Sequence, residues 1–398
     1  MAGENLHVGW RRVVLGVALI FAALGALAWS VAQNPEFAIN RVEWVDIPEP
    51  TALARGLHAA SLVADLHADS LLFGRDLLER SDVGHVDLPR LREGGVGLQF
   101  FTAATVMPMS TDPHDTSADA PDLIQLLGRV MGTPLASQSA LARALWQAGR
   151  LDGFAQRSNG RLVIIENRRD LERWRRMHEQ DAGVIGAVLG IEGAHALEAN
   201  ISNLDVAFDA GFRVLGLAHF FDNAFAGSAH GRRKGGLSEM GRELVRRMES
   251  KGVAVDLAHV SPFAIRDVLR IATRPTLVSH TGVRATCDNP RNLSDDQIRG
   301  IARGGGVIGI GYFDLAVCGR EPRHIVSAIR HVIDLVGDDH VALGSDFDGG
   351  VVTALDATGH IHVTQRMLDE GLSPSTIRKV LGENTLRVMA QLLPSSRE

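Results

Sequence analysis

The sequence predicts a parallel (β/α)8 barrel, and three observations support this fold class. Short apolar runs recur along the chain at the spacing of a β/α repeat, and helical patterns separate most of them. Eight such runs are present, which is the number of strands that closes a barrel of this kind. They occupy residues 62–65, 96–102, 185–191, 214–219, 253–258, 276–280, 307–312 and 341–345.

Length and composition fit one large domain. The 398 residues could hold two average domains, but α/β barrels are long single domains. A hydrophobic content of 45% and 42 glycines fit a buried parallel sheet with many tight turns. The formal net charge of −6 offers no basic face, so we exclude nucleic acid as a partner.

The N-terminal region predicts a membrane segment. After a short flank, residues 1–12, the stretch Val13–Ala32 has no charged residue and is long enough to cross a bilayer core of about 30 Å. Arg11 and Arg12 predict a cytoplasmic flank and a chain that continues on the periplasmic or extracellular side. The sequence Ser30-Val31-Ala32 resembles a signal-peptidase site, but the apolar stretch exceeds the ~7–15 residues of a signal peptide. We therefore expect an uncleaved anchor, or a secreted protein if the segment is removed.

The remainder of the chain is predicted to be a linker and one domain. Residues 33–55 contain Pro35, Pro48 and Pro50 and show little periodicity, which is typical of a spacer between a membrane and a domain. Residues 56–398 then form the barrel domain.

Further segments fit around the eight runs. The run Leu162–Glu166 is a ninth apolar run, one more than a barrel of eight strands needs, so we expect it to form a strand outside the barrel. The long interval Ala103–Gly160 follows the second run and predicts a lid or a pocket wall. Helical patterns lie at 121–132, 136–150, Glu239–Ser250, Ser261–Ile271 and Pro374–Leu393.

The two cysteines, Cys287 and Cys318, follow two consecutive predicted strands. A disulfide between them is possible outside the cytoplasm. A lone pair of cysteines is no disulfide framework, however, so the sequence favours two separate thiols.

Polar side chains gather where the apolar runs end. Alternation along the first run points Asp65, His67 and Asp69 to one face. A lone histidine after a strand is more often structural than a ligand, but here several potential ligands share the end at which barrel enzymes keep their chemistry. Nitrogen and oxygen ligands from separate strands are what a hydrolytic metal centre needs. Later runs end in Glu192, His259, His280 and Asp346.

The ligand types favour two metal ions. Two ions need a shared ligand, and a carboxylate can bridge them with its two oxygens, whereas an imidazole normally cannot. Glu192 is the natural bridge, with His67 and Asp69 on one ion and His259 and His280 on the other. A water between the ions would have a pKa near neutrality.

Ordered short motifs strengthen this interpretation and span about residues 55–390. The main motifs are Asp65-Leu66-His67-Ala68-Asp69, Gly190-Ile191-Glu192-Gly193-Ala194-His195, Leu217-Ala218-His219, Asp256-Leu257-Ala258-His259-Val260-Ser261, Val278-Ser279-His280, Asn289-Pro290-Arg291-Asn292-Leu293 and Gly344-Ser345-Asp346-Phe347-Asp348-Gly349. With these motifs, the sequence resembles the membrane dipeptidases, the renal-dipeptidase-like metallopeptidases of the metal-dependent hydrolase superfamily.

The resemblance implies a barrel with two zinc ions and a bridging hydroxide that hydrolyses dipeptides with a free C-terminal carboxylate. It implies the ligand set given above. It further implies that His219 polarises the scissile carbonyl and stabilises the oxyanion. Arg291 would grip the substrate carboxylate, and Asp346 would shuttle a proton between the water and the departing amine. The family pattern selects Asp346 over Asp348, its rival two residues on.

Other residues receive weaker assignments. His195 is either close behind the metal ligands or structural, and Asp65 is expected to orient His67 or the turn that follows. His230 lies in a run of charged residues and is expected to be an exposed loop residue. The 103–160 region shows no match to the family, which leaves the side-chain preference of the pocket open. His and carboxylate ligands would also accept manganese or cobalt.

Two other functions compete with a dipeptidase. An amidohydrolase of the same fold could act on N-acyl amino acids, β-lactams or lactones. A non-catalytic surface or binding protein could use the barrel as a scaffold, although the intact ligand set argues against it. The expected partners are a small dipeptide, the membrane through the N-terminal helix and, from the resemblance, a second copy of the chain in a homodimer.

Overall fold

The computed structural model describes residues 36–396 except for 44, 110, 111, 113, 137 and 138. In this part of the chain, eight parallel strands close into a barrel because β2 pairs with β4 and β1 pairs with β9. The predicted (β/α)8 barrel is confirmed. Its strands are β1 (Val63–Ala68), β2 (Val96–Ala104), β4 (Ile185–Glu192), β5 (Phe212–Gly216), β6 (Ala254–Asp256), β7 (Leu277–Thr281), β8 (Val307–Ile310) and β9 (Val341–Leu343).

The remaining strand, β3 (Leu162–Ile164), lies outside the barrel, as the extra apolar run predicts. It pairs with the first residues of β4, at Ile185, whereas β5 pairs with β4 further along, from Leu189 onward. The edge of β4 is thus shared by a short outer strand and a barrel strand.

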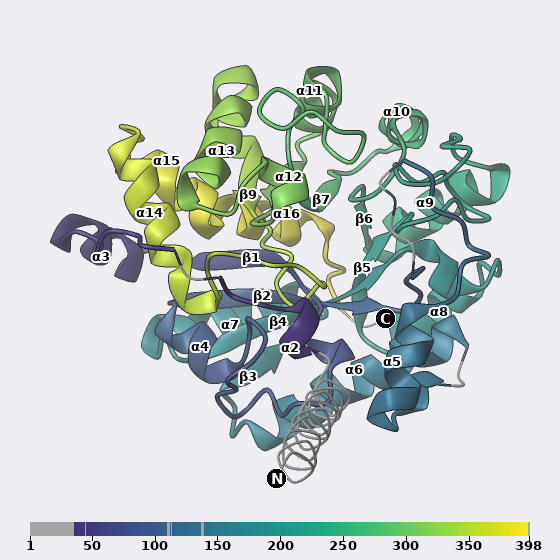
Figure 1. Cartoon of the computed structure of the whole chain (residues 1–398), viewed down its shortest axis with the longest axis horizontal. Coiled ribbons are helices and arrows are strands. Elements are labelled where there is room, and N and C mark those ends of the chain that lie inside the picture. Colours follow the sequence, from purple (N-terminus) through teal and green to yellow (C-terminus); the bar gives the residue numbers. More distant parts are fainter. Residues whose placement is uncertain (1–35, 44, 110–111, 113, 137–138, 397–398) are drawn as a thin grey trace, which may run out of the picture.

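Helices surround the barrel (Figure 1). The predicted helical patterns at 239–250 and 261–271 correspond to α9 and α10, which Ser238 and Ser261 cap through their side chains. The predicted tail helix is interrupted by a π-helical turn at Lys379–Glu383. The helices are α2 (Glu36–Ile39), α3 (Ala52–Ala59), α4 (Leu88–Glu93), α5 (Leu123–Met131), α6 (Ala140–Arg157), α7 (Arg168–Gln180), α8 (Asn203–Asp209), α9 (Glu239–Lys251), α10 (Pro262–Ile271), α11 (Asp295–Arg303), α12 (Asp314–Val317), α13 (Pro322–Val336), α14 (His360–Asp369), α15 (Pro374–Arg378) and α16 (Asn384–Leu392).

The inside of the barrel is filled at the end where the strands begin. One cluster of buried side chains receives a residue from each barrel strand, which places the cluster inside the barrel. Trp174 of α7 and Leu392 of α16 belong to the same cluster and close this end. Only the carboxyl end of the barrel is therefore free to hold a site. The strand residues of the cluster are Ala64, Leu98, Val188, Val214, Ala254, Leu277, Val307 and Ala342.

The start of the predicted spacer is bound to the barrel. Glu36 of α2 is 1% exposed and accepts a hydrogen bond of 3.0 Å from Arg75, which also forms an ion pair with Asp348. The Asn40 side chain accepts a hydrogen bond from the backbone of Gly350. Composition alone indicated a free spacer because it does not reveal that these polar groups have buried partners.

The expected membrane segment, Val13–Ala32, lies outside the described residues. Within the described part of the chain, no helix combines the length and the apolar character needed to cross a membrane.

Replacing Arg75 by methionine is expected to lower the free energy of unfolding by about 3 kcal/mol, because Glu36 and Asp348 are both buried and lose their cationic partner. Urea unfolding measures the loss. Arg80→Met is the matched control: Arg80 and its partner Glu93 are 53% and 55% exposed, and such pairs contribute at most about 1 kcal/mol. Equal losses in the two variants would contradict the stabilising role of the buried pairs.

Candidate metal centre

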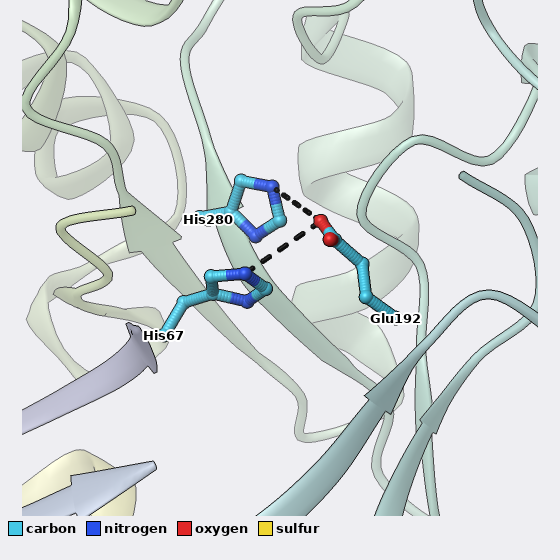
Figure 2. Close-up of side chains that lie close together, drawn as sticks. All are labelled: His67, Glu192 and His280. Atoms are coloured by element: carbon cyan, nitrogen blue, oxygen red, sulfur yellow. Dashed lines mark ion pairs between the residues drawn. The ribbon is translucent and has the colours of Figure 1, made fainter. Parts of the chain in front are cut away.

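The centre is built around Glu192, the last residue of β4. Its Oε1 lies 3.6 Å from Nε2 of His67, 3.5 Å from Nε2 of His280 and 3.1 Å from Nε2 of His259. Its Oε2 lies 3.2 Å from Nε2 of His219. Figure 2 shows His67 and His280 pointing toward the same carboxylate oxygen from two different strands. All five side chains are buried.

The potential ligand atoms form three overlapping groups in the part of the chain that the structure describes. Within each group the atoms lie within 4.8 Å of one another. Because Glu192 and His67 each belong to two groups, the groups form one continuous centre. All five ligands that the sequence suggests are brought together, and His219 and Asp346 lie with them. The groups are His67, Glu192 and His280; Glu192, His219 and His259; and His67, Asp69 and Asp346.

Three residues near the centre have left-handed backbone conformations, which non-glycine residues rarely adopt. The φ angles are 61° at His259, 66° at Asp346 and 61° at Asp348. Around His259 the backbone is held by Asp256, whose carboxylate accepts hydrogen bonds from the backbone of Ala258 and of Ser279. Strain of this kind persists where the surroundings fix it and is concentrated at functional sites.

The acidic residues of the centre repel one another. Burial raises the pKa of Glu192 well above its ordinary value, and the neighbouring Asp69 raises it further. Burial also raises the pKa of Asp346 to about 7. Burial by itself would lower the pKa of His67, but the carboxylates of Asp69 and Glu192 outweigh it and raise this pKa to about 10. Three buried carboxylates around one imidazole call for added positive charge.

Two further imidazoles of the centre, those of His259 and His280, are neutral. Burial holds the pKa of His259 and of His280 well below the ordinary value, and the positive charge of Arg291 adds to this effect at both. Neutral imidazole is the form that binds metal ions. Together with the carboxylates, these residues form the nitrogen and oxygen donor set that fits zinc.

Two hydroxyl groups orient the potential ligands, and neither was predicted from the sequence to have a role. The Ser279 Oγ lies 3.2 Å from Nδ1 of His67 and 2.9 Å from Nδ1 of His280, so both rings turn Nε2 toward Glu192. The Thr102 hydroxyl donates a hydrogen bond of 2.6 Å to Asp69. Such contacts fix the tautomer and orientation of metal ligands. Ser279 lies within a motif of the family resemblance, and its position before His280 was the available signal.

The expectation that His230 is exposed is wrong. The residue is 1% exposed, and its Nε2 lies 3.1 Å from Nδ1 of His259. The neighbouring charges suggested a solvated loop, but Ala229 donates a backbone hydrogen bond to His259 and draws the loop against the centre. Burial, together with Arg291, lowers the pKa of His230 to about 3, so this ring is neutral.

His195 and Asp65 lie behind the ligands. Nε2 of His195 lies 2.9 Å from the hydroxyl of Thr105, and its ring centre lies 6.3 Å from that of His219, so His195 lies outside the three groups of potential ligand atoms. Asp65 accepts hydrogen bonds from the backbone of His67, at 3.4 Å, and of Ser345, at 2.8 Å. It therefore joins the end of β1 to the segment that follows β9.

The structure separates the two rival aspartates. Oδ1 of Asp346 lies 3.7 Å from Nε2 of His67, within the centre. Asp348 instead accepts hydrogen bonds from Ser70 and from the backbone of His85, and it pairs with Arg75. Because its oxygens already have these partners, Asp348 is a structural residue.

Arg291 is a buried cation next to the centre. It is 4% exposed, and its guanidinium donates a hydrogen bond of 2.7 Å to the backbone carbonyl of His280. Burial lowers its pKa, against the opposing charges of Asp346 and Glu192. Among the described residues, no carboxylate lies within ion-pair distance of its guanidinium.

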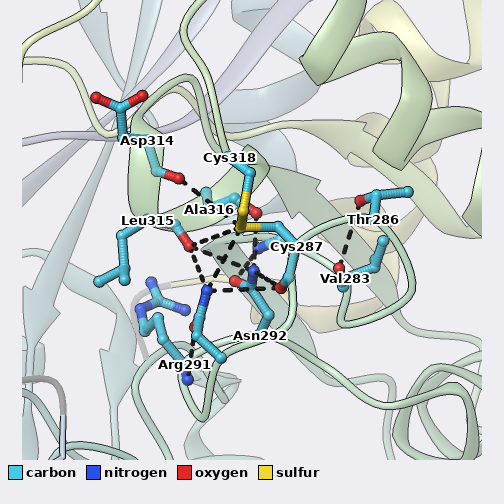
Figure 3. The surroundings of a disulfide bond; sticks show 11 residues. Val283, Thr286, Cys287, Arg291, Asn292, Asp314, Leu315, Ala316 and Cys318 are labelled. Atoms are coloured by element: carbon cyan, nitrogen blue, oxygen red, sulfur yellow. Dashed lines mark hydrogen bonds between the residues drawn. A yellow bond between two sulfur atoms is a disulfide. The ribbon is translucent and has the colours of Figure 1, made fainter.

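A disulfide fixes the loop that carries Arg291, contrary to the expectation of separate thiols (Figure 3). Cys287 and Cys318 follow the adjacent strands β7 and β8, and their Cα atoms lie 5.3 Å apart. Asn292 reinforces the link, because its side chain donates to the carbonyls of Cys287 and Ala316. The count of cysteines could not show that the two loops meet.

Comparison with known proteins identifies the family of the chain. The sequence model of a family described as membrane dipeptidase (Peptidase family M19) matches residues 51–397. The chain is 29% identical over 314 residues to dipeptidase verJ of Clonostachys rogersoniana, covering 77% of this chain and 76% of that protein. It is 28% identical over 325 residues to dipeptidase tcpJ of Claviceps purpurea (strain 20.1), covering 78% and 69%.

A solved structure has the same architecture. The crystal structure of dipeptidase AC, a metallopeptidase of family M19, is similar to this chain with a TM-score of 0.68 and 25% identity. The similarity covers 84% of this chain and 99% of that one. The family match covers all eight strands of the barrel. The chain therefore belongs to the membrane dipeptidase family, peptidase family M19.

Proposed function

We propose that the protein is a dinuclear zinc dipeptidase that cleaves dipeptides with a free C-terminal carboxylate. The observation that carries the proposal is the Glu192 carboxylate at the centre of the donor set. Its Oε1 lies within 3.6 Å of Nε2 of His67, His259 and His280, and Asp69 lies next to His67. Membership of a metallopeptidase family and relatives named dipeptidases support the same reaction class.

The donor set assigns each residue a place. His67 and Asp69 would hold one ion, His259 and His280 the other, and Glu192 both. Bound zinc would supply an activated water at neutral pH and would polarise the carbonyl of the substrate. Ser279 and His230 would keep the imidazoles oriented through their Nδ1 atoms.

The other residues act on the substrate. His219 is buried, and burial holds its pKa well below the ordinary value, so a neutral imidazole would donate a hydrogen bond to the developing oxyanion. Asp346, with a pKa raised by burial to about 7, can accept a proton from the attacking water and return it to the departing amine. The buried guanidinium of Arg291 would hold the carboxylate of the substrate.

We also propose that the barrel domain works outside the cytoplasm and that Val13–Ala32 anchors it. The uncharged length of this segment and the preceding Arg11 and Arg12 support that orientation. The disulfide between Cys287 and Cys318 supports it independently, because disulfides persist in oxidising compartments.

Replacing Glu192 by glutamine is expected to reduce bound zinc from about two ions per chain to one or fewer, because an amide cannot serve as an anionic bridge. Metal analysis of the purified protein measures this without depending on turnover. The control is Glu239→Gln, since the Glu239 side chain is 91% exposed on α9. Two equivalents of zinc in Glu192→Gln would contradict the bridging role.

Replacing Arg291 by methionine is expected to raise KM about 10- to 100-fold for dipeptides, because a charge-assisted contact with the carboxylate is lost. C-terminally amidated dipeptides serve as the internal control and should show little change. An unchanged KM for free dipeptides would favour an amidohydrolase that acts on other substrates. Circular dichroism would establish that the variant is folded.

Reducing the disulfide is expected to lower the free energy of unfolding by about 3–4 kcal/mol, because the bridge closes a loop across 31 positions of sequence separation. Thermal unfolding with and without dithiothreitol measures the effect. The double variant Cys287→Ser, Cys318→Ser should match the reduced protein and should not respond to the reductant. A wild-type protein that is insensitive to dithiothreitol would argue against the bridge.

A further inference from the structure

The pocket beside the metal centre has two chemically different sides. Its cavity volume is about 80 Å³, and Asp69, Glu192, His219, His259 and Asp346 line it on the catalytic side. Its other lining residues are mostly apolar. We call the apolar wall the set formed by Ile39, Leu72, Phe73, Ile124 and Leu127.

Three segments that are distant in sequence build the apolar wall. Ile39 ends α2, Leu72 and Phe73 follow β1, and Ile124 and Leu127 belong to α5. Leu72, Phe73 and Ile124 belong to a buried cluster that is separate from the barrel core, and Ile39 packs against that cluster. The wall is therefore supported from behind, which is the property of a preformed pocket.

Polar contacts fix the wall in place. Asp122 caps α5 by accepting a hydrogen bond from the backbone of Ile124, and it forms an ion pair with Arg143 of α6. Arg150 of α6 donates hydrogen bonds to the backbone carbonyls of Leu71 and Phe73. One helix thus ties α5 to the turn after β1, so the two main parts of the wall keep a fixed separation.

The position of Arg291 decides which residue of a dipeptide meets the wall. Arg291 contacts the backbone carbonyl of His280, and the charges of Asp346 and Glu192 act on it. Neither Arg291 nor His280 lines the pocket, whereas Asp69 does. A dipeptide with its carboxylate at Arg291 and its carbonyl at Glu192 therefore extends its first residue toward Asp69 and the apolar wall.

We propose that the protein selects dipeptides whose first residue has a large apolar side chain, such as leucine, phenylalanine or methionine. This inference rests on the dipeptidase function proposed above. A side chain of this size that moves from water into an apolar pocket strengthens binding by about 10- to 100-fold relative to glycine. A charged first residue would lose hydration without gaining a partner on this wall.

The first experiment compares substrates with the zinc-loaded, full-length protein. The kcat/KM values for Leu-Gly and Phe-Gly should exceed that for Gly-Gly by about 10- to 100-fold, and those for Lys-Gly and Glu-Gly should not. The reversed dipeptides Gly-Leu and Gly-Phe should show a smaller preference over Gly-Gly. Equal rates for all first residues would overturn the selectivity while leaving a dipeptidase. Hydrolysis of none of them would instead contradict the proposed function.

The second experiment uses two neighbouring leucines of α5. Leu127 is 8% exposed and lines the pocket, whereas Leu126 is 40% exposed and does not. Leu127→Asp should lower the ratio of the kcat/KM values for Leu-Gly and Gly-Gly at least about tenfold, because a carboxylate replaces apolar lining. Leu126→Asp should leave that ratio unchanged. If Leu127→Asp does not fold, Leu127→Ala replaces it and should lower the Leu-Gly to Gly-Gly ratio of kcat/KM several-fold. An unchanged ratio in a folded Leu127 variant would overturn the proposal.

Discussion

The burial of a carboxylate cluster at the carboxyl end of the barrel is the constraint on which the rest of the structure depends. Glu192, Asp69 and Asp346 lie close together and are removed from water, which is unfavourable unless positive charge is placed among them. His67, with its pKa raised to about 10, carries one positive charge, but the imidazoles of His259 and His280 are neutral and add none. Metal ions can provide the remaining charge, so the geometry of the centre is understandable as that of a site shaped for cations.

The barrel makes this arrangement possible because separate strands end at one place. A filled interior at the opposite end, closed by Trp174, leaves one end free for polar residues. The positive φ angles of His259 and Asp346 turn the chain sharply just after the strands. Ser279 and Asp65 then bind the neighbouring strand ends to one another through side-chain hydrogen bonds. The positions of the side chains at the metal centre are thus fixed where the strands meet the loops that follow them.

Because the centre is built at strand ends, part of it could be predicted from the sequence. The strands and their terminal ligands, such as His67 and Glu192, repeat a local pattern of an apolar run followed by a polar residue, so they could be identified without coordinates. The buried state of His230, the disulfide of Cys287 with Cys318 and the packing of Glu36 depend on which loops meet in space. The charged residues next to His230 in the sequence predicted an exposed side chain, but such residues can cover a buried ring.

The difference between strand ends and loop packing also separates the catalytic groups from the residues that select the substrate. Strand ends supply the reacting groups, so any chain with this barrel and these motifs can present them. The apolar wall instead requires α2, the turn after β1 and α5 to meet, and polar anchors such as Arg75, Asp122 and Arg150 hold these segments together. None of these anchors lies among the metal ligands. Changes in the anchors could therefore alter which dipeptides bind while the metal centre stays intact, and this independence lets one catalytic scaffold accept different substrates.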